Sequence, residues 1–124
     1  MSRGRVLLLE DDPALRGLLE EALTSEGLEV QVCDSFAALQ ASAAAGGGDL
    51  VVADFWGGAQ RELDEPAREQ MRELSRLLPV VLLTGRTWAV GASAESVGVR
   101  SLIRKPFDLG DLLEAVDEAL SERG

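Results

Sequence analysis

The sequence predicts an α/β fold in which a parallel sheet of five strands is covered by helices on both faces. Short apolar runs alternate five times along the chain with segments of helical periodicity. Alternating strands and helices of this kind build a parallel sheet through right-handed crossovers. The 124 residues contain no linker or internal repeat, so we expect one domain. These observations together predict a doubly wound sandwich of three layers, α/β/α.

The predicted strands are recognised by their apolar residues. The run at residues 5–9 is short and continuous, as expected for a buried strand, and the run at 49–53 is apolar enough to be central. Residues 28–33 alternate between polar and apolar, which places this strand nearer an edge. The remaining strands are expected at residues 80–83 and 100–104.

The first two helices have clear start and stop signals. From Pro13 onward, apolar residues recur at helical spacing until Gly27 ends the helix. Ser35 is the expected N-cap of a second helix that reaches about residue 45, where three consecutive glycines break it.

The other helices differ in strength. A charged helix begins near Pro66 and runs to about residue 78. Residues 87–98 are rich in glycine and serine, so they predict a short, weak helix. Asp108 is the expected N-cap of the last helix, which has apolar residues along one face.

The composition limits the functions that the chain can have. Its formal charge of −10 argues against direct binding to nucleic acid, which requires a basic surface. No apolar run could span a membrane or act as a secretory signal, so we expect a cytoplasmic protein. Histidine is absent, which excludes histidine-based catalysis and histidine metal ligands. The single cysteine, Cys33, is expected to be buried and reduced.

Lysine occurs once, at Lys105, whereas the other eleven basic residues are arginines. Lysine is a flexible point charge that can follow one oxygen of an anion, while arginine binds two oxygens at fixed angles. Codon bias would explain a single surviving lysine equally well. The residue alone therefore decides nothing, and its neighbours in the fold become important.

Polar residues follow four of the five predicted strands. Glu10 and Asp11 follow the first strand, Asp54 the third, Thr84 the fourth and Lys105 the fifth. In parallel α/β sheets ligands bind beyond the carboxyl ends of the strands, so we expect one site here. Grouped acids require a cation, and oxygen ligands without histidine or cysteine favour Mg²⁺. Asp54 could then attack a phosphoryl group, while Lys105 and Thr84 contact its oxygens.

Each of these residues also has a structural explanation. Glu10, Asp11 and Asp12 could favour the start of the first helix through its dipole, and Asp54 could be a turn residue. The combination at four strand ends is what favours a site.

These residues resemble the motifs of the receiver domain of two-component response regulators. The resemblance covers essentially the whole chain and rests on Glu10-Asp11-Asp12, Val52-Ala53-Asp54, Leu82-Leu83-Thr84-Gly85 and Lys105-Pro106-Phe107. It implies the flavodoxin-like strand order 2-1-3-4-5, and it implies that residues 1–124 are one receiver domain without an output domain. The implied phosphoacceptor is Asp54, with Thr84 and Lys105 at the phosphoryl group. The implied Mg²⁺ ligands are Glu10, Asp11, Asp54 and the backbone carbonyl of Trp56.

The resemblance also implies partners. The chain would take its phosphoryl group from a histidine kinase or a histidine phosphotransfer protein and would act on a downstream protein target. It would not be an enzyme beyond self-phosphorylation and self-dephosphorylation. Docking would use the first helix and the face of the fourth helix, fifth strand and fifth helix, and a weak homodimer is possible there. The bond between Lys105 and Pro106 would be cis, as is usual in the family.

The chain departs from the family at positions that concern signal output. Receivers usually have an aromatic residue in the middle of the fifth strand, where this chain has Leu102. Many also have a proline four residues after the phosphoacceptor and a glycine eight residues after it, where this chain has Gly58 and Glu62. A second interpretation is therefore a receiver-like interaction module that works without phosphorylation.

Two other functions fit less well. A phosphatase with an aspartate nucleophile usually has a second aspartate two residues later, where this chain has Trp56. Flavin binding would need a phosphate loop after the first strand, where the acids would repel the phosphate.

Overall fold

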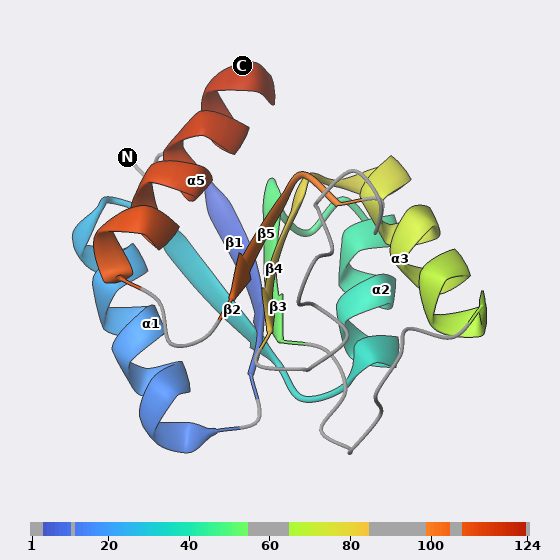
Figure 1. Ribbon diagram of the computed structural model, residues 1–124, viewed down its shortest axis with the longest axis horizontal. Coiled ribbons are helices and arrows are strands. Elements are labelled where there is room, and N and C mark those ends of the chain that lie inside the picture. Colours follow the sequence, from blue (N-terminus) through green and yellow to red (C-terminus); the bar gives the residue numbers. More distant parts are fainter. Residues whose placement is uncertain (1–3, 11, 55–64, 85–98, 105–107, 124) are drawn as a thin grey trace.

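A sheet of five parallel strands forms the centre of the computed structural model, which describes residues 4–10, 12–54, 65–84, 99–104 and 108–123 (Figure 1). The strand order is β2-β1-β3-β4-β5, so the order implied by the resemblance is confirmed. The strands are β1 (Arg5–Leu9), β2 (Glu29–Cys33), β3 (Leu50–Asp54), β4 (Val80–Thr84) and β5 (Ser101–Arg104).

The strand boundaries differ from the predicted ones by single residues. Asp54 and Thr84 belong to the sheet and do not follow it, because Asp54 pairs with Leu83 and Thr84 pairs with Arg104. At their amino ends, β2, β3 and β5 each begin one residue later than predicted. The residue before β3, Asp49, bonds to the start of β1 through both its backbone and its side chain.

Helices cover both faces of the sheet (Figure 1). α1 (Pro13–Ser25) and α5 (Leu109–Arg123) lie on one face, and α2 (Phe36–Ala44) and α3 (Glu65–Leu77) lie on the other. The three-layer sandwich predicted from the sequence is therefore present. The predicted helix at residues 87–98 lies outside the described residues.

Two apolar clusters, one on each face of the sheet, form the core. Alternate residues of each central strand belong to different clusters, because successive side chains of a strand point to opposite faces. β1 and β3 therefore have fully buried side chains on both faces, as the continuous apolar runs predicted. The α1/α5 cluster includes Val6, Leu8, Leu19, Leu23, Val52 and Leu112, and the α2/α3 cluster includes Leu7, Leu39, Val51, Leu74 and Leu82.

The end of α1 explains the glycine that stops it. Gly27 has a positive φ of 85°, which L-residues with a Cβ rarely adopt. The Gly27 N–H donates to the Thr24 carbonyl at 3.0 Å, and the Leu28 N–H donates to the Leu23 carbonyl at 3.2 Å. This pair of bonds is a Schellman motif, which satisfies carbonyls that the helix leaves free.

The predicted N-caps of two other helices are also confirmed. The hydroxyl oxygen of Ser35 accepts the N–H of Ala38 at 3.1 Å, and the carboxylate of Asp108 accepts the N–H of Gly110 at 2.9 Å. Pro66 is in the first turn of α3, where its missing N–H costs no helical hydrogen bond.

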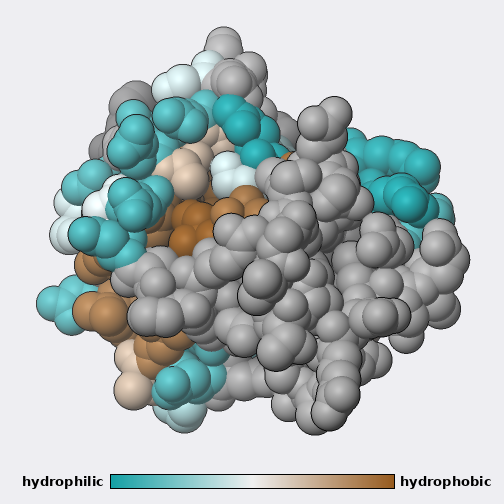
Figure 2. All heavy atoms as spheres, in the orientation of Figure 1, coloured by the Kyte–Doolittle hydropathy of each residue, from teal (hydrophilic) through white to brown (hydrophobic). Residues whose placement is uncertain are grey.

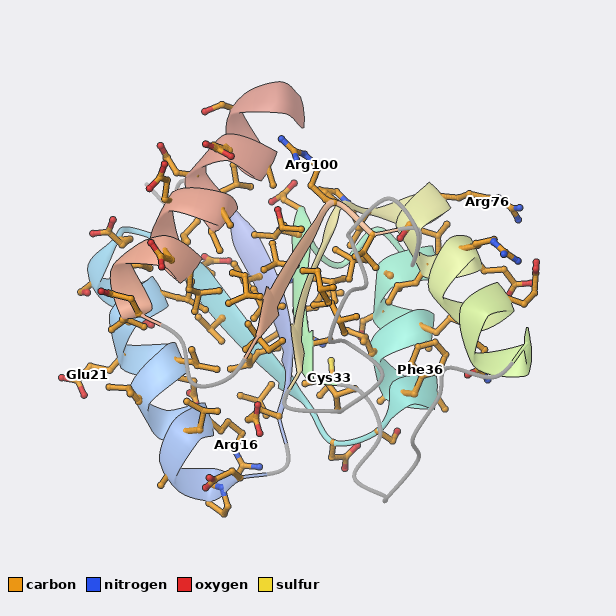
Figure 3. The ribbon with its side chains drawn as sticks, in the orientation of Figure 1. Arg16, Glu21, Cys33, Phe36, Arg76 and Arg100 are labelled. Carbon is orange, nitrogen blue, oxygen red and sulfur yellow. The ribbon has the colours of Figure 1, made fainter. Side chains whose placement is uncertain are left out.

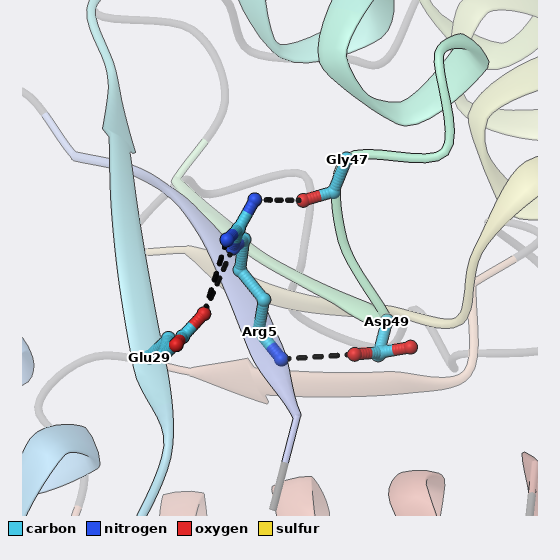
Figure 4. Close-up of polar contacts among 4 residues, drawn as sticks. All are labelled: Arg5, Glu29, Gly47 and Asp49. Carbon is cyan, nitrogen blue, oxygen red and sulfur yellow. Dashed lines mark hydrogen bonds and ion pairs between the residues drawn. The ribbon is translucent and has the colours of Figure 1, made fainter. Parts of the chain in front are cut away.

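Polar contacts join three segments at the amino edge of the sheet (Figure 4). The Arg5 guanidinium donates to the Glu29 carboxylate at 3.1 and 3.2 Å and to the Gly47 carbonyl at 3.3 Å. The Arg5 backbone N–H donates to the Asp49 carboxylate at 2.9 Å, and the Asp49 N–H donates back to the Arg5 carbonyl at 2.8 Å. These contacts, called the Arg5 network below, connect β1, β2 and the segment between α2 and β3.

No helix in the described part of the chain combines the length and the apolar character needed to cross a membrane.

Candidate functional site

The carboxyl ends of β1, β3, β4 and β5 lie at one edge of the sheet. Leu9 pairs with Ala53, so Glu10 is level with Asp54 on the neighbouring strand. Thr84 is one position beyond Leu83, the partner of Asp54. The backbone therefore brings Glu10, Asp54 and Thr84 together, as the sequence analysis expected, while their chemical roles remain predictions.

Glu10 is buried although it is an acid. Its side chain is 3% exposed, and it is the only buried charged residue in the part of the chain that the structure describes. One carboxylate oxygen, Oε1, accepts the backbone N–H of Asp12 at 3.2 Å. A buried carboxylate is costly unless hydrogen bonds or a cation compensate for its lost hydration. The burial therefore favours a functional explanation over a solvated helix end.

The carboxylate of Asp12 has a different structural role from that of Glu10. Its carboxylate is the N-cap of α1, because it accepts the N–H of Ala14 at 3.0 Å and that of Leu15 at 3.5 Å. The helix-start explanation is therefore correct for Asp12. The sequence could not separate the two roles, since both positions are acids that follow the same strand.

Glu10 is the one predicted metal ligand whose side chain the structure describes. Asp11 and Trp56 lie outside the described residues, and Asp54 is placed by its backbone alone. Within the described residues, no three acidic or cysteine side chains form a group that could hold a metal ion. The carboxylate of Glu10 nevertheless fits a hard cation such as Mg²⁺, which prefers oxygen ligands.

Lys105 and Pro106 also lie outside the described residues, together with the predicted cis bond between them. The backbone of β5 reaches Arg104, which pairs with Thr84. The last described residue of β5, Arg104, is therefore at the same edge as Asp54 and Thr84.

Leu102, at the position of the usual aromatic residue, lies in the middle of β5. It is half-buried and packs against the α2/α3 cluster. Its ladder partner is Leu82 on β4. The side chain therefore lies against the core on that face of the sheet.

Cys33 lies at the end of β2 and is buried, as predicted. Burial, together with the charge of Asp34, raises the pKa of its thiol, and a hydrogen bond with Ser42 opposes this shift. The thiol is therefore protonated at neutral pH, and a protonated thiol is a poor nucleophile and metal ligand. Cys33 is not a candidate site residue.

Arg16, which belongs to none of the sequence motifs, has its side chain near the start of α1 at this edge (Figure 3). The only sequence signal was its position one helical turn after Asp12.

The sequence matches the family model of the response regulator receiver domain over residues 6–117. The DNA-binding transcriptional regulator NtrC of Rhizobium meliloti (strain 1021) is 32% identical over 123 residues, which are 98% of this chain and 25% of that protein. The uncharacterized transcriptional regulatory protein YkoG of Bacillus subtilis (strain 168) is 28% identical over 100% of this chain and 54% of that protein. The chain thus spans only part of the length of these relatives.

Solved structures share the fold over nearly the whole chain. A response regulator receiver domain protein from Clostridium thermocellum superposes with a TM-score of 0.76 at 20% identity, covering 99% of this chain and 97% of that one. A structure described as a transiently phosphorylated switch in bacterial signal transduction superposes with a TM-score of 0.75 at 26% identity, covering 99% and 98%.

Proposed function

Because this chain belongs to the family of response regulator receiver domains, we propose that it accepts a phosphoryl group on Asp54 in a two-component phosphorelay. A receiver domain is a signalling domain and not an enzyme that turns over a substrate. The register of the sheet carries the proposal, since it sets Asp54 beside the buried acid Glu10 and one position from Thr84.

The proposed reaction transfers a phosphoryl group from a phosphohistidine of the donor. A carboxylate oxygen of Asp54 forms a bond to phosphorus while the P–N bond of the donor breaks. The electron pair of that bond stays on the imidazole, which takes up a proton from water. Lys105 would hold one charged phosphoryl oxygen, and Thr84 would donate its hydroxyl to another. The product is an acyl phosphate, and its hydrolysis returns the carboxylate of Asp54.

Mg²⁺ would be held by the carboxylates of Glu10, Asp11 and Asp54 and by the carbonyl oxygen of Trp56. When bound, the ion supplies positive charge that stabilises the phosphoryl oxygens. The three carboxylates would otherwise repel one another. Because Glu10 is buried, water can screen little of its charge, so its carboxylate would interact strongly with a bound cation.

The donor would be a histidine kinase or a histidine phosphotransfer protein in the cytoplasm, because this chain has no histidine of its own. We expect it to dock beside α1. Leu18 of α1 is 51% exposed, and Leu15, Leu109 and Leu113 are half-buried. Figure 2 shows apolar atoms on this side of the molecule with hydrophilic residues around them. An apolar area with a polar border is typical of protein docking surfaces.

Mass spectrometry of the intact chain tests the phosphoacceptor. Incubation with acetyl phosphate and Mg²⁺ is expected to add one phosphoryl group, and chelation of Mg²⁺ is expected to prevent the addition. Asp54→Asn should remain unmodified, while Asp117→Asn, on the exposed side of α5, should react like the wild type. Equal labelling of Asp54→Asn and the wild type would contradict the proposal.

A second candidate function is an interaction module that works without phosphorylation. The packing of Leu102 against the α2/α3 cluster favours it, because this side chain is already part of the core. This function predicts that the downstream protein binds wild type and Asp54→Asn equally well. Calorimetric titration of the two proteins with that target, each after incubation with acetyl phosphate and Mg²⁺, separates the candidates, since a phosphorylation-dependent contact would form only with the wild type.

A further inference from the structure

Arg16 is a cation in the second turn of α1, at the carboxyl edge of the sheet. Its backbone N–H donates to the Asp12 carbonyl at 2.8 Å, so it stands one helical turn after the residue that caps the helix. Helical side chains lean toward the helix N-terminus, and Figure 3 shows the Arg16 side chain lying near the start of α1. The guanidinium is therefore on the same edge as Glu10 and the end of β3.

Arg16 is half-buried, and its charge has no partner among the residues that the structure describes. Within the described residues, no ion pair or side-chain hydrogen bond involves it. Asp12 and Glu20, four residues to either side, are at pairing distance on a helix, but Asp12 is engaged with backbone N–H groups. The chain has 22 acidic and 12 basic residues, so most basic side chains are expected to have an acidic partner, and Arg16 has none among the described residues.

The proposed phosphoacceptor site indicates what Arg16 could bind. In that site one Mg²⁺ and Lys105 would neutralise the carboxylates of Glu10, Asp11 and Asp54. An incoming phosphate-bearing donor then adds negative charge of its own. Among the described side chains, the guanidinium of Arg16 is a cation on this edge, and its planar fork suits phosphate oxygens.

We propose that Arg16 is a positioning residue that attracts and orients the phosphate of the incoming donor toward Asp54. This inference rests on the proposed phosphoacceptor function. The partly buried stem of the side chain limits the freedom of its charged end, which lowers the entropy lost when an anion binds. Arg16 forms no bond with the reacting phosphorus, and it acts before the transfer step.

Arg76 provides a matched control. It is also an arginine without an ion pair or side-chain hydrogen bond among the described residues, and it lies in the last turn of α3. Figure 3 shows it far from Arg16, on the other face of the sheet. Arg16→Gln and Arg76→Gln therefore make the same chemical change and the same change in net charge at different places.

The experiment measures the second-order rate constant for phosphorylation by acetyl phosphate in saturating Mg²⁺, at low and at high ionic strength. At low ionic strength, Arg16→Gln should react roughly three- to fivefold more slowly, as expected for one charge about 10 Å from a doubly negative anion in water. The deficit should disappear near 1 M salt, where the screening length is about 3 Å. Arg16→Lys should retain most of the rate, and Arg76→Gln should match the wild type.

The possible outcomes separate this inference from the function on which it rests. If the wild type is phosphorylated and Arg16→Gln matches Arg76→Gln at every salt concentration, the role of Arg16 is refuted while the phosphoacceptor stands. A deficit that persists unchanged at high salt, accompanied by a lower urea midpoint, would indicate a packing role and would also refute it. If the wild type accepts no phosphoryl group, both proposals fail.

Discussion

Ser75 in α3 should destabilise the protein, and replacing it should raise stability. Its hydroxyl oxygen is buried and has no hydrogen-bond partner within the described residues. A buried polar group without a partner costs about 1 kcal/mol or more. Alanine also has a higher helix propensity than serine, by about 0.5 kcal/mol. Ser75→Ala is therefore expected to increase the free energy of unfolding by about 1.5 kcal/mol, which corresponds to a rise in Tm of about 6 °C.

Ser42 in α2 is the matched control for this substitution. It is also a half-buried helical serine, but its hydroxyl accepts a hydrogen bond from the Gln31 side-chain amide at 3.1 Å. Ser42→Ala gains the same helix propensity but loses this bond and the hydrogen bond with the Cys33 thiol, so its free energy of unfolding should fall by at least about 0.5 kcal/mol. Urea unfolding of both variants measures the difference, which should be at least about 2 kcal/mol. The reasoning is refuted if the two substitutions have the same effect.

Four further predictions concern the site, its docking surface and the fold. Glu10→Gln should weaken Mg²⁺ binding about tenfold in calorimetric titration, because it removes a ligand charge but keeps the acceptor for the Asp12 N–H. Leu18→Asp should slow transfer from a phosphohistidine donor about tenfold, with the acetyl phosphate rate unchanged, because only the protein donor needs the docking surface. Gly27→Ala should lower the free energy of unfolding by about 1 kcal/mol in urea, because Gly27 has a φ of 85°. Because the pKa of the Cys33 thiol is raised in the folded state, the protonated thiol favours folding. Its contribution to the free energy of unfolding is fully present below about pH 8.5 and is lost as the pH rises through the folded-state pKa. Urea midpoints of the wild type should therefore fall more steeply above that pH than those of Cys33→Ala.

Each of these predictions has an outcome that would contradict it. An unchanged urea midpoint in Gly27→Ala would mean that the positive φ at this position costs alanine no free energy. Unchanged Mg²⁺ affinity in Glu10→Gln would remove Glu10 from the metal site. A slower reaction of Leu18→Asp with acetyl phosphate would mean that the substitution disturbs the site itself. Equal pH profiles for the wild type and Cys33→Ala would mean that the thiol does not titrate differently on folding. The chain contains no tyrosine and one lysine, so few other side chains titrate in this pH range.

The elements of the fold were readable from the sequence because their signals are local. Ser35 and Asp108 indicate helix starts, and Gly27 indicates a helix end, because the hydrogen bonds at each of these ends join residues within one or two turns. The continuous apolar runs of β1 and β3 identified the central strands for a similar reason. The strand order came from the resemblance and could not be read from periodicity.

The candidate site could be predicted only in part from the sequence. Asp54 and Thr84 could be placed at one edge because each ends an apolar run, and the ladder agrees with this placement. The separation of roles between Glu10 and Asp12 could not be predicted, because it depends on which carboxylate turns inward. Arg16 was missed for a similar reason, since a lack of partners is a property of the folded chain.

The Arg5 network has a consequence for where a shape change could occur. It connects segments that are 24 to 44 residues apart in sequence, and it lies at the edge of the sheet opposite to Asp54. A movement that began at the carboxyl ends of the strands would leave these contacts in place. The Arg5 network would then oppose a shift of the strand register at the amino ends, and a displacement near Asp54 would be taken up by tilting of the carboxyl ends.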